Sequence, residues 1–182
     1  MPSAVFLDRD GVVNEAVVRD GRPYPPASAG EVVLCAGADE ALHALRARGF
    51  VLIVVSNQPD VARGTTSLAA VEAINACLRR LVPLDDVLIC PHDDADGCAC
   101  RKPKPGMLQE GARVHGIDLT SSYLVGDRWR DIEAGASAGC TTVFIDRGYA
   151  ERGPEAPDAR VASIAEAAAW IITDAEEYDA AR

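Results

Sequence analysis

Two aspartates separated by one residue follow the first apolar segment of the chain. The sequence AVFLDRDG places Asp8 and Asp10 directly after an expected buried strand, so both carboxylates can enter one cleft. One carboxylate can then attack a phosphorus atom to form an acyl phosphate. The other can protonate the leaving oxygen and later deprotonate the attacking water. The same residues also suit an Asx-type turn after a strand, so the motif alone leaves both interpretations open.

Three further polar side chains have the chemistry of phosphate or metal binding. Ser56, at the end of the apolar segment VLIVVSN, suits a hydrogen bond to a phosphoryl oxygen. Lys102 is one of only two lysines and suits neutralisation of a phosphoryl group. Asp127, after the segment LVG, suits Mg²⁺, which needs few protein oxygens, and we expect Asp131 to orient its surroundings. The ordinary alternatives are turn capping, a solvated lysine and a helix N-terminus.

A cluster of soft metal ligands lies just before Lys102. Its spacing is C-x-H-x5-C-x-C, formed by Cys90, His92, Cys98 and Cys100. Four such ligands predict a tetrahedral Zn²⁺ with no position left for water, and hence a structural zinc. A redox site would need C-x-x-C, and a disulfide between Cys98 and Cys100 would close a strained ring. The remaining cysteines stand alone among apolar or helical residues, which favours core positions: Cys35, Cys77 and Cys140.

Apolar segments of strand length alternate with segments of helical period. The expected strands span 4–8, 51–57, 87–90, 122–127 and 141–146, and the expected helices span 38–49, 67–81, 107–116, 131–138 and 163–172. This alternation predicts an α/β fold, a single Rossmann-like three-layer domain over residues 1–182 with a parallel β-sheet. Ligands of such sheets bind at the carboxyl ends of the strands, and the polar side chains above fall at those ends.

The segments between these polar side chains are too short for a cap domain. Asp10 to Ser56 accommodates one loop, one helix and one strand, and Ser56 to Lys102 accommodates a helix, a strand and the zinc-stapled loop. Small loops must then select the substrate. The zinc would stiffen a short polar loop and so position Arg101 and Lys102. The sequence assigns no role to Lys104. We expect loops over 19–31 and 147–159, and the segment RDGRPYPP of the first loop could reach the cleft, although its residues cannot be assigned.

The net charge of −10 over 182 residues argues against binding to nucleic acid or to an anionic membrane. A local basic cluster still suits a small phosphorylated substrate: Arg101, Lys102, Lys104, Arg128 and Arg130. There is no apolar run of about 18 residues and no secretory signal, so we expect a cytoplasmic protein with no membrane partner. No long exposed apolar helix is evident, which favours a monomer.

The four polar positions occur in the order that resembles the haloacid dehalogenase-like phosphotransferases. DRDG resembles the first motif of that superfamily, the serine of VSN the second, the lysine of RKP the third and VGDxxxD the fourth. The resemblance implies a Mg²⁺-dependent phosphatase. In it Asp8 would be the nucleophile and Asp10 the general acid and base, while Ser56 and Lys102 would hold the phosphoryl group. Asp8, the backbone carbonyl of Asp10 and Asp127 would hold Mg²⁺.

That resemblance to the superfamily covers about residues 4–146. Within the superfamily, the zinc loop followed by RKPxPGM resembles the D-glycero-D-manno-heptose-1,7-bisphosphate 7-phosphatases. The resemblance implies removal of the 7-phosphate. Asn57 and Gln58 would line the substrate site, Arg101 would contact the substrate, and Arg128 would contact the distal phosphate or the sugar.

Three other functions stay open at this point. Histidinol-phosphate phosphatases share the C-x-H…C-x-C loop and RKP, and another small sugar phosphate is a further candidate substrate. A non-catalytic zinc-binding interaction module is the alternative from a different class of protein. Such a module has no need of an intact set of phosphoryl-transfer residues, which argues against it.

Overall fold

Six parallel strands form the central sheet, in the order β5-β4-β1-β6-β7-β8. The computed structural model describes residues 1–180 and gives these bounds: Ala4–Leu7 (β1), Val51–Asn57 (β4), Asp86–Cys90 (β5), Tyr123–Gly126 (β6), Thr141–Ile145 (β7) and Ala159–Val161 (β8). The central strand β1 is buried along its whole length, as expected for a strand covered on both faces. The predicted α/β three-layer fold is confirmed.

The register of β1 brings the polar strand ends to one edge of the sheet. Leu7 pairs with Val54 of β4 and with Val125 of β6. The residues that follow these positions by one or two places are Asp8, Ser56 and Asp127. They therefore leave the sheet side by side, as the sequence predicts.

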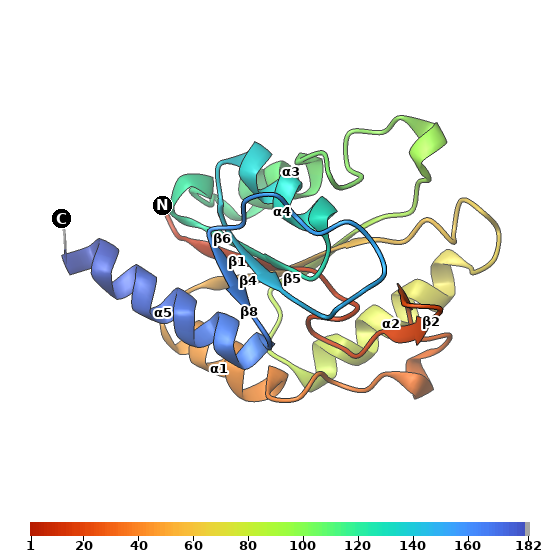
Figure 1. The fold of residues 1–182 in the computed structure, drawn as a ribbon, viewed down its shortest axis with the longest axis horizontal. Coiled ribbons are helices and arrows are strands. Elements are labelled where there is room, and N and C mark those ends of the chain that lie inside the picture. The colour runs from red at the N-terminus through yellow and green to blue at the C-terminus, as the bar shows by residue number, and fades with distance from the viewer. Residues whose placement is uncertain (181–182) are drawn as a thin grey trace.

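Five helices cover the two faces of the sheet (Figure 1). One face carries α1 (Ala38–Ala47), α2 (Leu68–Leu81) and α5 (Ile164–Ala180), over the larger apolar cluster. The other face carries α3 (Gly106–His115) and α4 (Trp129–Ala138), over a smaller cluster. None of the helices in the described part of the chain combines the length and the apolar character needed to cross a membrane.

The buried stripe of α2 is narrower than its sequence suggests. Leu68 and Leu81 are 49% and 45% exposed, although both fit the apolar period of the segment. At 100° per residue, they lie roughly 70° to either side of the centre of the buried residues Val71, Ile74, Asn75 and Leu78. Asn75 lies closer to that centre and is 3% exposed, so a polar side chain takes a position inside the stripe.

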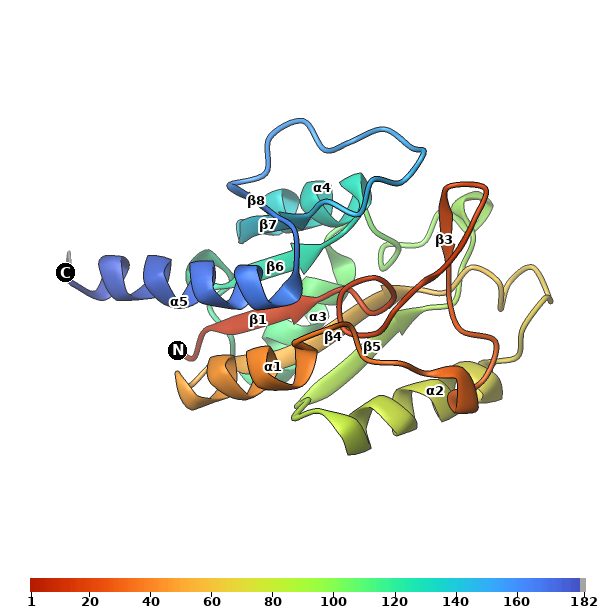
Figure 2. The same cartoon turned by 60° about the horizontal axis from the view of Figure 1, so that its bottom comes forward.

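The expected loop 19–31 contains regular structure. Strands β2 (Val17–Arg19) and β3 (Arg22–Tyr24) pair as an antiparallel hairpin, followed by a 3-10 turn over Ala29–Glu31. The hairpin turn is Asp20-Gly21, and both residues have positive φ, of 50° and 72°. An Asp-Gly pair with this backbone is a typical two-residue hairpin turn, so the pair was the signal for this element. The hairpin rises beside the edge of the sheet where β1 ends (Figure 2), and no larger cap is present among residues 1–180.

Candidate active site

The ammonium group of Lys102 joins two carboxylates at the carboxyl edge of the sheet. Its Nζ lies 2.6 Å from Asp8 Oδ1, 2.6 Å from Asp131 Oδ1 and 2.7 Å from the carbonyl oxygen of Val55. Lys102 is only 2% exposed, so its charge depends on these partners. Although burial opposes the charge, Asp131 and Asp8 raise the pKa of Lys102 above its usual range.

Three buried carboxylates surround this lysine. Asp8, Asp127 and Asp131 each offer an oxygen, and these oxygens lie within 4.8 Å of one another. Burial raises the pKa of Asp8 to about 6 against the opposing charge of Lys102, and Asp131 adds to the increase. Burial and then the charge of Asp8 raise the pKa of Asp127 well above its usual value. One ammonium does not balance three carboxylates, so the group has room for further positive charge.

Asp127 has one oxygen held and one oxygen free. Its Oδ2 accepts a hydrogen bond from the hydroxyl of Tyr149 at 2.8 Å, while its Oδ1 is buried and has no partner among the described residues. A buried oxygen without a donor is costly unless a cation binds it. Hard oxygen ligands of this kind fit Mg²⁺.

Two glycines allow the acids to come this close. Gly11 has a φ of +93°, and a Cβ atom there would lie 1.9 Å from Asp127 Oδ2. A Cβ atom on Gly126 would lie 2.1 Å from the Cβ of Asp131. The glycine of DRDG and the glycine before Asp127 are therefore required by the packing of the carboxylates.

Asp131 has a larger part than its position in the sequence indicated. Its Oδ1 contacts Lys102, and its Oδ2 accepts a hydrogen bond from the backbone N–H of Arg128 at 3.0 Å, at the start of α4. The sequence pointed instead to the surroundings of Asp127. Tyr149, from the expected loop 147–159, was also missed, because nothing in a lone tyrosine between glycine and alanine indicates a metal-site partner.

Asp10 lies beside the group with its carboxylate turned to other donors. Gln58 Nε2 donates to Asp10 Oδ2 at 3.0 Å and to Ser56 Oγ at 2.9 Å, and so links the first two sequence motifs. Asn57 links the second motif to the third. Its side-chain amide exchanges two hydrogen bonds with the backbone of Lys102, at 3.0 and 3.1 Å.

A cleft of about 320 Å³ opens above these residues. It is lined by all the predicted catalytic and substrate-binding side chains: Asp8, Asp10, Ser56, Asn57, Gln58, Arg101, Lys102 and Arg128. Residues outside that predicted set also line it, among them Arg22, Tyr24, Arg63 and Arg130. The hairpin thus contributes to the cleft, as we expected that part of loop 19–31 could, although the sequence did not show which of its residues line it.

The arginines at the edge of the cleft are held by acids. Asp94 accepts from Arg101 Nε at 2.8 Å and from Arg130 Nη1 at 3.0 Å. Arg128 Nε donates to Glu151 at 2.8 Å. These contacts fix the direction of long side chains and leave the cleft edge rich in guanidinium groups, which bind phosphate well.

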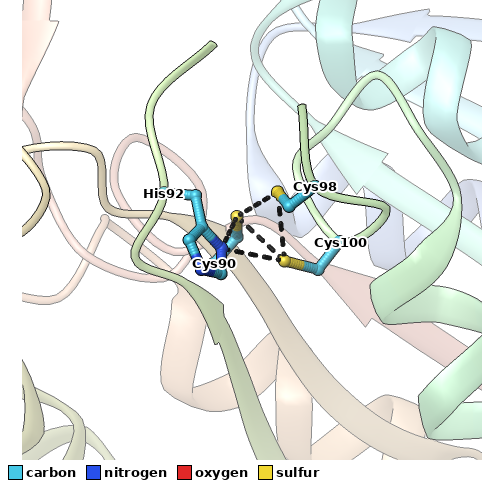
Figure 3. A group of neighbouring side chains, drawn as sticks. All are labelled: Cys90, His92, Cys98 and Cys100. Atoms are coloured by element: carbon cyan, nitrogen blue, oxygen red, sulfur yellow. Dashed lines mark hydrogen bonds between the residues drawn. The ribbon is translucent and has the colours of Figure 1, made fainter. Parts of the chain in front are cut away.

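The four predicted zinc ligands point at one another (Figure 3). Cys100 Sγ lies 3.1 Å from Cys90 Sγ, 3.4 Å from Cys98 Sγ and 3.4 Å from His92 Nδ1. Cys90 Sγ lies 3.6 Å from both Cys98 Sγ and His92 Nδ1. All four atoms are thus close enough to share one tetrahedral ion with bonds of about 2.0–2.3 Å.

Lys104 lies next to this cluster. Its Nζ donates to the carbonyl oxygens of Gly97 and Cys98, at 2.9 and 2.7 Å. Arg101 Nη1 donates to the carbonyl of His92 at 3.1 Å. Both basic side chains therefore close the loop that carries the ligands.

Comparisons with known proteins identify the family of this chain. The family model described as HAD-hydrolase-like matches residues 99–175. The D-glycero-beta-D-manno-heptose-1,7-bisphosphate 7-phosphatase of Pseudomonas aeruginosa is 37% identical over 155 residues, which are 82% of this chain and 84% of that protein. The enzyme of the same name from Escherichia coli K12 is 34% identical over 168 residues, 86% of this chain and 85% of that protein. The chain belongs to the haloacid dehalogenase-like phosphatases.

A solved structure of this superfamily supports the fold and the metal. The crystal structure of D,D-heptose 1,7-bisphosphate phosphatase from B. bronchiseptica, complexed with magnesium and phosphate, superimposes with a TM-score of 0.81 at 31% identity. The match covers 94% of this chain and 99% of that one. The match therefore supports the α/β fold of this chain, while the magnesium and the phosphate belong to that crystal structure.

The charge balance around Lys102 can be tested by removing the ammonium. In protein without added Mg²⁺ at neutral pH, Lys102→Met should lower the free energy of unfolding by about 3–5 kcal/mol, because it leaves buried carboxylates without their partner. Urea unfolding measures the change, and added Mg²⁺ should restore part of the loss by binding the folded state. Lys104→Met, at the only other lysine, is the control and should cost less than about 1 kcal/mol. Equal losses in the two variants would contradict the balance described here.

Proposed function

We propose that this phosphatase removes the 7-phosphate of D-glycero-D-manno-heptose 1,7-bisphosphate. The observation that carries the proposal is the buried group of Asp8, Asp127, Asp131 and Lys102 below an arginine-edged cleft. The names of the relatives in Pseudomonas aeruginosa and Escherichia coli support the choice of substrate.

The carboxylates of Asp8 and Asp127 and the backbone carbonyl of Asp10 would hold Mg²⁺, with Asp131 beside them. The ion supplies positive charge that offsets the repulsion between an anionic nucleophile and an anionic phosphate. The residues present fit this ion, because the buried Oδ1 of Asp127 has no hydrogen-bond partner in the described chain and can bind a cation.

The first step transfers the phosphoryl group to Asp8. A carboxylate oxygen of Asp8 forms a bond to phosphorus as the bond from phosphorus to the sugar oxygen breaks. Asp10 gives its proton to that leaving oxygen. Lys102 and Ser56 hold the phosphoryl oxygens during the transfer, Lys102 through its charge and Ser56 through a hydrogen bond.

The second step releases inorganic phosphate. A water oxygen bonds to phosphorus, the bond from phosphorus to Asp8 breaks, and the water proton passes to Asp10. Both protons therefore move through one carboxyl group, so the position of Asp10 affects both steps.

The cleft favours a second phosphate over an ammonium group. Asp60 and Asp94 are acids at its edge, but each already contacts an arginine, at 3.6 Å for Asp60 and at 2.8 Å for Asp94. A histidinol phosphate would need a free acid for its ammonium group. Arg101 and Arg128 are also paired with acids, but a guanidinium has five N–H donors, and those that the acids do not use suit the distal phosphate of a bisphosphate.

Substrate comparison tests this choice. We expect kcat/KM for the heptose 1,7-bisphosphate to exceed that for histidinol phosphate and for the heptose 7-phosphate at least about tenfold, since one hydrogen bond to a charged group contributes about 1.5–3 kcal/mol. Arg101→Met should reduce the bisphosphate preference. Arg113→Met, at an arginine of α3 that pairs with Glu110 outside the cleft, is the matched control. A preference for histidinol phosphate would overturn the proposed substrate.

We further propose that Cys90, His92, Cys98 and Cys100 hold a structural Zn²⁺. The contacts of the four ligand atoms with one another support this, and four protein ligands leave no position on a tetrahedral ion open for water. The cytoplasmic location and the monomeric state remain predictions from the sequence.

Metal analysis checks the zinc. Protein purified without chelator should contain about one zinc per chain, and Cys98→Ser should lose it and melt at a lower temperature, because metal binding stabilises the folded loop. Cys77→Ser, at a cysteine of α2 outside the cluster, should keep the zinc. A folded wild-type protein without zinc would rule the site out.

A further inference from the structure

Arg9, between the two aspartates of DRDG, is the largest fully buried side chain of the described residues. A buried guanidinium is costly unless it is paired and hydrogen-bonded. Nε lies 3.2 Å from both carboxylate oxygens of Asp10, and Nη2 lies 3.0 Å from Oδ2. The pairing thus joins two neighbouring residues, one inside the protein and one at the cleft.

Asn75 anchors the other end of the guanidinium. Its Oδ1 accepts from Arg9 Nη1 at 2.9 Å, across 66 residues of sequence. Asn75 is 3% exposed and lies between Ile74 and Leu78 on the buried face of α2. An amide in such a face is unfavourable unless its hydrogen bonds are made, so helix α2 presents this acceptor at some cost to its own packing.

Two amides complete the surroundings of the Asp10 carboxylate. Asn14 Nδ2 donates to Oδ1 at 3.0 Å, and Gln58 Nε2 donates to Oδ2 at 3.0 Å. Among the described residues that donate to this carboxylate, Arg9 is the one with a charge, and it alone contacts both oxygens. The carboxylate is therefore held from inside the protein while it lines the cleft.

We propose that Arg9, fixed by Asn75, is a positioning residue for Asp10. This proposal rests on the proposed role of Asp10 as the acid and base of phosphoryl transfer. Arg9 does not touch the substrate, because it is fully buried. It sets the carboxyl group where it can give a proton to the leaving oxygen and take one from water, so α2 contributes to catalysis without lining the cleft.

Leaving-group dependence separates positioning from stability. The ester p-nitrophenyl phosphate needs no proton on its leaving oxygen, whereas a sugar phosphate does. We expect Arg9→Met and Asn75→Leu to lower kcat/KM about 10²-fold on the sugar phosphate, the size of effect that a misplaced group produces, with little change on the nitrophenyl ester. A burst of nitrophenolate should precede a slow steady state, because the water step also needs Asp10.

Three comparisons decide the outcome. Asp10→Asn sets the full size of the effect, and Ile74→Ala is the control for a weakened α2, with equal changes on both esters expected. Asn75→Leu keeps Arg9 and carries the test if Arg9→Met does not fold. The selectivity expected of Asp10→Asn is a larger loss of kcat/KM on the sugar phosphate than on the nitrophenyl ester. If Asp10→Asn shows that selectivity, then equal losses on both esters in Arg9→Met and Asn75→Leu, or no loss, would overturn the inference. An Asp10→Asn variant without that selectivity would instead overturn the proposed role of Asp10.

Discussion

The contact of Lys102 with Asp8 and Asp131 is the interaction on which the rest of the site depends. Parallel strands bring several acids to one buried edge, and like charges at such distances oppose one another. The ammonium of Lys102, at 2.6 Å from Asp8 and from Asp131, offsets part of this repulsion. The negative charge that remains can still bind a further cation. Gly11 and Gly126 are the steric condition for the same arrangement, since a side chain at either position would displace an acid.

Much of the neighbouring structure serves to bring this lysine in. Lys102 lies on a segment outside the sheet, and its backbone is held by Asn57 at the end of β4. The four predicted zinc ligands and Lys104 close the loop directly before it. That loop also carries Asp94, which directs two arginines at the cleft edge. A segment with little apolar content of its own is thus fixed by polar contacts at both ends.

The sequence predicted the parts of the molecule that depend on local pattern. The apolar strands, the order of the four motifs and the C-x-H-x5-C-x-C ligands all follow from spacing, and the fold and the clustering of the ligands are confirmed. The contact between Lys102 and Asp131, and that between Arg9 and Asn75, join residues far apart in the chain, and no local pattern shows them. Asn75 is buried whereas Leu68 and Leu81 are exposed, because small differences in position around the axis of α2 decide which side chains face the core. The Asp20-Gly21 hairpin, by contrast, had a local signal, hidden in a segment rich in glycine, proline and charge.

A covalent phosphoryl group on Asp8 is the central claim of this account. Acid quenching during turnover, reduction with borohydride and peptide mass spectrometry would convert an acyl phosphate into homoserine at the modified position. The account predicts homoserine at position 8, dependent on both substrate and Mg²⁺, and an unmodified carboxylate at position 10. Homoserine at position 10, or turnover at full rate with no reducible intermediate at either position, would contradict it.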